Sequence, residues 1–245
     1  MRHASRLSAL TLIAATAFLL ISCKPVVIDD DRPETSRAFP RAERPVSEVI
    51  GNQWSTEEAR DKANEANDVM DRATIKPGMT VADIGAGEGY YTVRLAERVG
   101  AEGRVLAQDI SSDAIERLGT RVNRERLDNV SIKLGAIDDP RLPEGSFDRI
   151  FLVHMYHEVT EPYAFLWRLL PALKEGGQVI VVDADLPTKD HGMPPKLLFC
   201  EFESIGYKLV GFEKKPSVGG YFARFEATKN RPAPSKIKAC TSKTK

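Results

Sequence analysis

Three glycines spaced two residues apart, Gly85, Gly87 and Gly89, follow a short apolar segment that contains Asp83. This pattern is typical of a buried strand that turns sharply into a helix, where glycine lets the backbone approach a ligand closely. A dinucleotide fingerprint would need its third glycine at the position of Tyr90, and a phosphate-binding Walker loop would continue as Gly-Lys-Ser/Thr. The turn therefore predicts a pocket for an adenosine-bearing ligand without phosphates.

A second acid, Asp109, ends the apolar segment 105–109 and lies about 20 residues beyond the glycine turn. In a βαβ unit, an acid at this separation accepts hydrogen bonds from the two ribose hydroxyls of a nucleoside. A carboxylate suits this task because it only accepts hydrogen bonds and has several lone pairs. The glycine turn and Asp109 thus predict one binding site.

The pattern Asp-x-Gly-x-Gly-x-Gly followed by an acid after the next strand resembles the class I S-adenosylmethionine-dependent methyltransferases. The resemblance is strong over about residues 70–185, where it includes segments 142–148, 150–153, 169–177 and 179–183. It is weak over the remainder to residue 227. It implies S-adenosylmethionine as the cofactor and methyl transfer as the activity. A nicotinamide oxidoreductase is disfavoured by Tyr90.

The resemblance assigns roles to the residues of the turn. Gly85, Gly87 and Gly89 would admit the methionine part and the sugar, Asp83 would hold the ammonium end, and Asp109 would hold the ribose. Two alternatives remain at this stage. The glycines could form a tight turn without a ligand, and Asp83 could be a helix-capping acid.

The adenine contact departs from the family pattern. Relatives often have Gly-Asp after the third strand, whereas this chain has Gly135-Ala136, and Ala136 cannot accept a hydrogen bond from the adenine amine. Asp138 is the expected substitute, with an ordinary loop role as the alternative. Ile110 and Ile137 are expected to lie at the cofactor, Ile137 against the ring.

Three candidate catalytic residues, His154, Tyr156 and His157, follow the expected strand 148–153. Methyl transfer needs an acceptor held in line and, where it carries a proton, a group that removes it. His157 is the first candidate for a base or an orienting residue, because histidine exchanges a proton near neutral pH. The alternative is that this group caps the strand and binds Glu158 or the backbone.

The acceptor is expected to be a small molecule or a small polypeptide. The formal net charge is zero, and no basic stripe or amino-methylating Asn/Asp-Pro-Pro-Tyr/Phe motif occurs, which argues against nucleic acid. Cys23, Cys200 and Cys240 are far apart in sequence, so neither a metal site nor a disulfide framework is expected. The sequence does not specify the oligomeric state.

Strands alternate with helices through the core, which predicts an α/β fold with a doubly wound, mostly parallel seven-stranded sheet. Helices are expected at 55–72, 90–99, 113–126, 163–174 and 194–205. Strands are expected at 79–84, 104–109, 130–134, 148–153, 178–182, 207–212 and 221–227, with the last two forming an antiparallel hairpin.

The N-terminal residues predict export. Residues 1–23 have basic residues before a short apolar stretch, and Leu20-Ile21-Ser22-Cys23 resembles a lipobox, which would make Cys23 a lipid anchor in the cell envelope or periplasm. The alternatives are an ordinary signal peptide and an uncleaved anchor that happens to contain a cysteine. Residues 24–50 are predicted to be a disordered linker, 51–228 the methyltransferase-like domain and 229–245 a basic disordered tail.

Export opens a second functional hypothesis. An exported domain is separated from the cytosolic cofactor supply, and Ala136 weakens the usual adenine contact. The alternative function is therefore a non-catalytic envelope protein that keeps the fold for binding or interaction.

Overall fold

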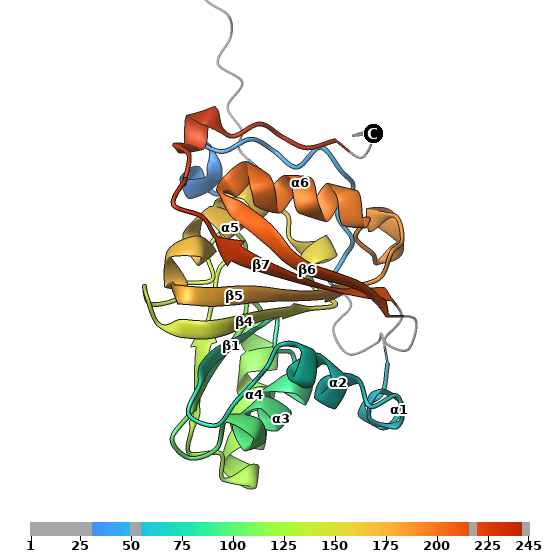
Figure 1. The fold of residues 1–245 in the computed structure, drawn as a ribbon, viewed down its shortest axis with the longest axis vertical. Helices are drawn as coiled ribbons and strands as arrows, with labels where there is room; N and C mark the ends of the chain where they lie inside the picture. The colour runs from blue at the N-terminus through green and yellow to red at the C-terminus, as the bar shows by residue number, and fades with distance from the viewer. Residues whose placement is uncertain (1–30, 50–54, 216–219, 242–245) are drawn as a thin grey trace, which may run out of the picture. The chain divides into compact units, whose positions relative to one another are not determined.

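A single sheet of seven strands carries the site, in the order β3-β2-β1-β4-β5-β7-β6. The computed structural model describes residues 31–49, 55–215 and 220–241 (Figure 1). The first five strands pair in parallel, and β7 is antiparallel to both β5 and β6, which confirms the predicted sheet. The strands are β1 Thr80–Ile84, β2 Arg104–Asp109, β3 Val130–Leu134, β4 Phe147–Val153, β5 Leu173–Asp183, β6 Tyr207–Lys215 and β7 Gly220–Ala227.

Helices cover both faces of the sheet (Figure 1). They are α1 Glu57–Lys62, α2 Glu65–Arg72, α3 Tyr90–Val99, α4 Ser112–Glu125, α5 Pro162–Leu169 and α6 Pro195–Ile205. Neighbouring residues of a strand face opposite layers: Val81 packs with α2 and α3, whereas Ala82 packs with α5 and α6. Because the central strands are buried on both faces, they read as continuous apolar runs.

Two predicted helix boundaries differ from the structure. The expected helix 55–72 is divided into α1 and α2 at Asn64, which adopts the left-handed conformation with φ 52°. Thr56 caps α1 by accepting from the Ala59 amide at 3.3 Å. The helix expected to reach residue 174 ends at Leu169, because Pro171 lies in a short 3-10 turn before β5.

Residues 31–49 are not the predicted disordered linker. Phe39 is buried in the core cluster that α5 and α6 form. Arg44 donates from Nε to Glu201 Oε1 at 2.9 Å, and neither side chain is exposed. A polar composition predicts disorder only where the charges lack buried partners, and this pairing spans 157 residues of sequence.

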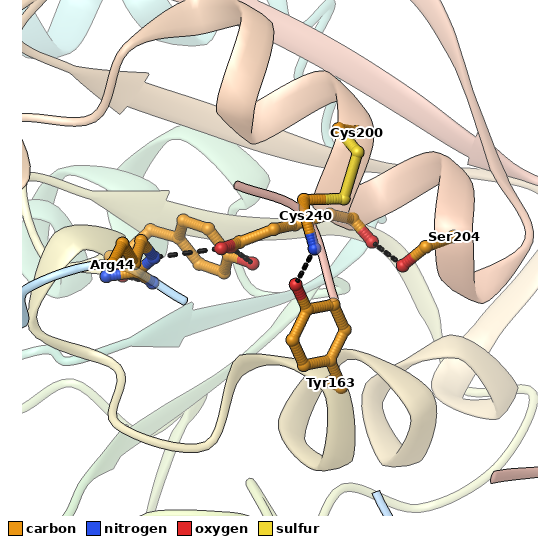
Figure 2. The surroundings of a disulfide bond; sticks show 7 residues. Arg44, Tyr163, Cys200, Ser204 and Cys240 are labelled. Atoms are coloured by element: carbon orange, nitrogen blue, oxygen red, sulfur yellow. Dashed lines mark hydrogen bonds and ion pairs between the residues drawn. A yellow bond between two sulfur atoms is a disulfide. The ribbon is translucent and has the colours of Figure 1, made fainter. Parts of the chain in front are cut away.

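The described part of the C-terminal segment, residues 229–241, also differs from the predicted disordered tail. Cys240 forms a disulfide with Cys200 of α6, with Cα atoms 6.0 Å apart (Figure 2). The Cys240 amide donates to the Tyr163 hydroxyl at 2.6 Å, and the Trp167 indole donates to the Pro232 carbonyl at 2.9 Å. The two cysteines lie 40 residues apart in sequence, so their spacing alone did not indicate the pair.

The predicted signal region, including Cys23, and residues 24–30 lie outside the described residues. Among the helices of the described ranges, none is long and apolar enough to cross a membrane.

Candidate active site

Three glycines form the turn between β1 and α3. Gly85, Gly87 and Gly89 have φ angles of 68°, 55° and 89°, in the left-handed region that favours glycine. A Cβ at Gly85 would lie 3.0 Å from Met155 Cγ, and one at Gly89 would lie 2.5 Å from Leu118 Cδ1. The turn is therefore fixed both by its backbone and by its surroundings.

Asp109 joins this turn to the end of β2. Its Oδ2 accepts from the Gly87 amide and its Oδ1 accepts from the Ser111 amide, both at 2.9 Å. A carboxylate has about four lone-pair sites, so two backbone bonds leave capacity for ligand hydroxyls. The side chain lines the cavity described below, and its contact with a ribose stays a prediction.

Asp83 is a buried acid at the end of β1. Its carboxylate accepts from the Thr92 hydroxyl at 2.6 Å, so it contacts the first turn of α3. It also lines the cavity. Burial raises the pKa of Asp83 to about 6, while the hydrogen bond from Thr92 lowers it. A ligand cation would favour the ionised form of this carboxyl.

A cavity of about 500 Å³ opens at the carboxyl ends of β1, β2 and β4. Its walls include the glycine turn, Asp83, Asp109, Ala136 and His154, and also Ile110, Ile137, His157, Glu158 and Phe165. The position agrees with the rule that ligands bind beyond the carboxyl ends of parallel strands where the strand order reverses.

Ile110 and Ile137 form the apolar part of this cavity. Their side chains remain 44% and 41% exposed, so each offers apolar surface that a flat ring could cover. Such surface in a cavity beside Asp109 suits a purine base. Both residues line the cavity, and their contact with the cofactor stays a prediction.

Asp138 does not fill the place of the missing family acid. Its carboxylate is buried and accepts from Ser36 Oγ and Arg168 Nη1, both at 2.8 Å, and from the Thr35 hydroxyl. It is not among the residues that line the cavity. Two of these donors, Thr35 and Ser36, belong to the N-terminal segment, and the third, Arg168, belongs to α5.

The predicted catalytic group divides into three environments. His157 lines the cavity, is 2% exposed, and its Nδ1 lies 2.9 Å from Asp183 Oδ1. Tyr156 is fully buried, does not line the cavity, and donates to Glu201 Oε2 at 2.7 Å. A catalytic role for Tyr156 is therefore not supported by its position.

His154 lies on another wall of the cavity and pairs with residues that sequence reasoning missed. Its Nε2 is 3.5 Å from Glu65 Oε1, and Arg60 donates to the same oxygen at 2.6 Å. Burial raises the pKa of Glu65, but hydrogen bonds from His154 and Arg60 outweigh it and hold the pKa at about 2. Arg60 also lies over the Tyr90 ring, 3.9 Å from its centroid. Arg60 of α1 and Glu65 of α2 are visible as charged residues in the sequence, but they match no motif that would mark them as part of the site.

A second constellation was also missed. His157, Glu158 and His191 each offer one ligand atom, and these atoms lie within 4.8 Å of one another. No metal site was predicted, because the cysteines are far apart in sequence. His191, which lies in the loop after β5, is more than 30 residues from His157 and Glu158, so their spacing matches no metal-binding motif.

Comparison with known proteins identifies the family. The model of the methyltransferase domain family matches residues 75–200, which is half of the chain. The chain belongs to the methyltransferase domain family. The matched residues run from the strand before the glycine turn to α6, so they include the whole cavity wall except its N-terminal part.

Individual relatives agree with this family. A ubiquinone/menaquinone biosynthesis C-methyltransferase of Stenotrophomonas maltophilia is 32% identical over 157 residues, which is 62% of this chain and 56% of that protein. One from Idiomarina loihiensis is 32% identical over 120 residues, covering 48% and 47%. The chain spans about half the length of the curated relatives it matches. A SAM-dependent methyltransferase from Aquifex aeolicus has a TM-score of 0.62 at 25% identity and covers 68% of this chain and 91% of its own.

S-adenosylmethionine is the cofactor that this membership implies, and the residues present fit it. The glycine turn excludes side chains at the position of close approach, Asp109 retains accepting capacity, and Ile110 and Ile137 expose apolar surface. Asp83 supplies a buried carboxylate for the ammonium group. The cavity thus offers groups whose chemistry would suit the ammonium end, the ribose and the base of this cofactor.

Proposed function

We propose that this protein transfers a methyl group from S-adenosylmethionine to a small-molecule acceptor. The observation that carries the proposal is that Asp83 and Asp109, the expected cofactor residues, line the same cavity as His157, whose Nδ1 pairs with the buried Asp183. A small cavity with one convergent polar wall suits a small ligand better than a macromolecule. The curated relatives are named for quinone biosynthesis, which also favours a small acceptor.

When bound, the cofactor supplies a methyl group activated by a sulfonium: the acceptor bonds to the methyl carbon while the carbon–sulfur bond breaks and its electron pair returns to sulfur. The protein has two tasks beside this step. It must hold the acceptor in line with the methyl group, and it must accept the acceptor's proton where there is one.

His157 is placed for the second task or for orienting the acceptor. The Asp183 carboxylate accepts from Nδ1–H of His157, which fixes the tautomer and leaves Nε2 as a hydrogen-bond acceptor. Asp183 is itself held by the Ala184 amide, which donates to Oδ1 at 2.8 Å. The pair is rigid, because both side chains are almost fully buried.

The test is transfer of labelled methyl from S-adenosylmethionine to a panel of small acceptors, with Asp109→Ala as the matched inactive control. Transfer by the natural chain that is lost in the variant would support the proposal. Tight cofactor binding without transfer to any acceptor class would instead favour a non-catalytic binding protein, an alternative that the relatives do not support.

We also propose that the protein is exported and anchored by a lipid on Cys23. The sequence of residues 1–23 motivates this proposal, and the Cys200–Cys240 disulfide supports an oxidising compartment. Expression of the natural chain and Cys23→Ser in a bacterial host, followed by fractionation, tests it. The natural chain should be recovered with membranes and the variant should not; equal membrane recovery of both would contradict lipidation.

A further inference from the structure

The loop between β5 and α6 brings His191 to the side chains that follow β4. The His191 and His157 rings meet edge to face, with centroids 5.7 Å apart and planes at 84°. Glu158 Oε1 lies 4.0 Å from His157 Nε2. One ligand atom from each of the three residues lies within 4.8 Å of the others, so an ion placed among them could contact all three after small side-chain movements.

Asp183 completes an arrangement that metal-binding histidines commonly have. A histidine ligand usually donates its second ring N–H to a carboxylate, which fixes the tautomer and aims the other nitrogen at the metal. His157 Nδ1 lies 2.9 Å from Asp183 Oδ1 and 3.1 Å from Oδ2, and Asp183 is fully buried. Its Nε2 is therefore the nitrogen left for a ligand, on the side where Glu158 lies.

His191 supplies a second, independent indication. Its Nδ1 is buried and has no hydrogen-bond partner among the described residues. A buried polar atom without a partner is costly, and a common explanation is a missing water or ion. His191 also holds the left-handed conformation with φ 54°, which is uncommon for a residue other than glycine and is often found at functional positions.

We propose that His157, Glu158 and His191 bind a divalent transition metal ion, with zinc as the first candidate. Two imidazoles and one carboxylate are a ligand set that zinc accepts in a tetrahedral site, with the fourth position open. His157 and Glu158 line the cavity, so the open position faces the space left for the acceptor. With the ion bound, His157 acts as a ligand that orients the acceptor and not as a base.

The ion also limits the class of acceptor. This inference rests on the proposed function, whereas the metal site itself does not. A metal at the cavity wall lowers the pKa of a hydroxyl or thiol that binds to it, and the proton passes to solvent. The site therefore favours an acceptor that presents an ionisable O–H or S–H group.

The experiment is a titration of the full-length, untagged protein with Co²⁺ and Zn²⁺. Cobalt reports tetrahedral coordination by its visible absorption, and competition with a chromophoric chelator gives the affinity for zinc. We expect one ion per chain, with affinity weakened by at least about 100-fold in His191→Asn and in Glu158→Gln and by about 10–100-fold in Asp183→Asn. Asparagine tolerates the left-handed backbone at position 191, so His191→Asn should fold.

His154→Asn is the matched control, because His154 lies on another cavity wall beside Glu65 and has the same left-handed backbone. It should leave the metal affinity unchanged. The proposed site would be overturned if the natural chain bound neither ion at micromolar concentrations. It would also be overturned if His191→Asn and Glu158→Gln bound the ions as tightly as the natural chain. Calorimetry should show that His191→Asn binds S-adenosylhomocysteine as tightly as the natural chain does. This measurement separates failure of the metal site from failure of the cofactor site.

Discussion

Asp109 is the residue that connects the glycine turn to the next strand. By accepting from the Gly87 and Ser111 amides it holds the turn open, and it keeps accepting capacity toward the cavity. Each oxygen of this carboxylate thus accepts one backbone hydrogen bond. Alanine would remove both bonds, and asparagine would replace one accepting oxygen with a donor.

Asp109→Ala should weaken binding of S-adenosylhomocysteine by about 10–100-fold, because hydrogen bonds to a charged group contribute about 1.5–3 kcal/mol. Calorimetric titration measures the change. Glu116→Ala, which removes an exposed acid from the neighbouring helix α4, should bind like the natural chain. Equal affinity of Asp109→Ala and the natural chain would place the ribose elsewhere.

Asp83 gives the site a pH dependence. Burial raises its pKa to about 6, so in the ligand-free protein the carboxyl is protonated below pH 6 and ionised above it. An ammonium group binds the ionised form, so the affinity for S-adenosylhomocysteine should be constant above about pH 7 and fall by up to about tenfold per pH unit below pH 6.

The control for this pH dependence is Asp83→Asn, which should bind more weakly and show no change over the same range. The stability of the ligand-free protein has the opposite sign, because the unfolded carboxyl, with a pKa of 3.8, ionises first. The Asp83 contribution therefore favours the folded state below about pH 4 and is lost as the pH rises through 6. A pH-independent affinity in the natural chain would contradict the assignment of Asp83 to the ammonium group.

At the scale of elements, a segment outside the predicted domain supports the residues that follow β4. Residues 31–49 bring Arg44 to Glu201 of α6, and Glu201 also accepts from the Tyr156 hydroxyl. Arg44 donates further to the His157 carbonyl at 3.2 Å. The main chain at the candidate catalytic histidine is thus supported by a segment about 110 residues earlier in the sequence.

Arg44→Met should lower the free energy of unfolding by about 3–5 kcal/mol, because it leaves the buried Glu201 carboxylate without its charged partner. Burial opposes the charge of Arg44, but Glu201 raises the pKa of the guanidinium, so Arg44 keeps its charge. Chemical denaturation of the variant and of Arg37→Met, an exposed position in the same segment, measures the difference. Similar stability of the two variants would show that the pair does not hold the segment.

The contrast between Asp109 and Asp138 shows which parts of the site a sequence can predict. The glycine turn, Asp83 and Asp109 are set by backbone conformation and by spacing within one βαβ unit, so the pattern was sufficient. Asp138 and Tyr156 turn toward Ser36 and Glu201, partners that are remote in sequence. The strands were predicted because short β-branched runs alternate with helices, whereas the pairing of Cys200 with Cys240 depends on how α6 packs.

At the scale of the whole molecule, the disulfide fixes the C-terminal segment to α6 (Figure 2). It closes a loop across a sequence separation of 40 residues, which should stabilise the fold by about 2–4 kcal/mol by restricting the unfolded chain. A reducing agent should therefore lower the melting temperature of the natural chain. The double variant Cys200→Ser/Cys240→Ser should melt at the lower temperature with or without the reductant; an unchanged melting temperature on full reduction would contradict this role.

The central claim is that this chain, a member of the methyltransferase domain family, binds S-adenosylmethionine in the cavity beside the glycine turn. Calorimetric titration of the purified protein with S-adenosylhomocysteine tests it most directly, with circular dichroism to establish that the protein is folded. We predict one molecule bound per chain and weaker binding in Asp109→Ala. Absence of binding to the folded natural chain would contradict the claim.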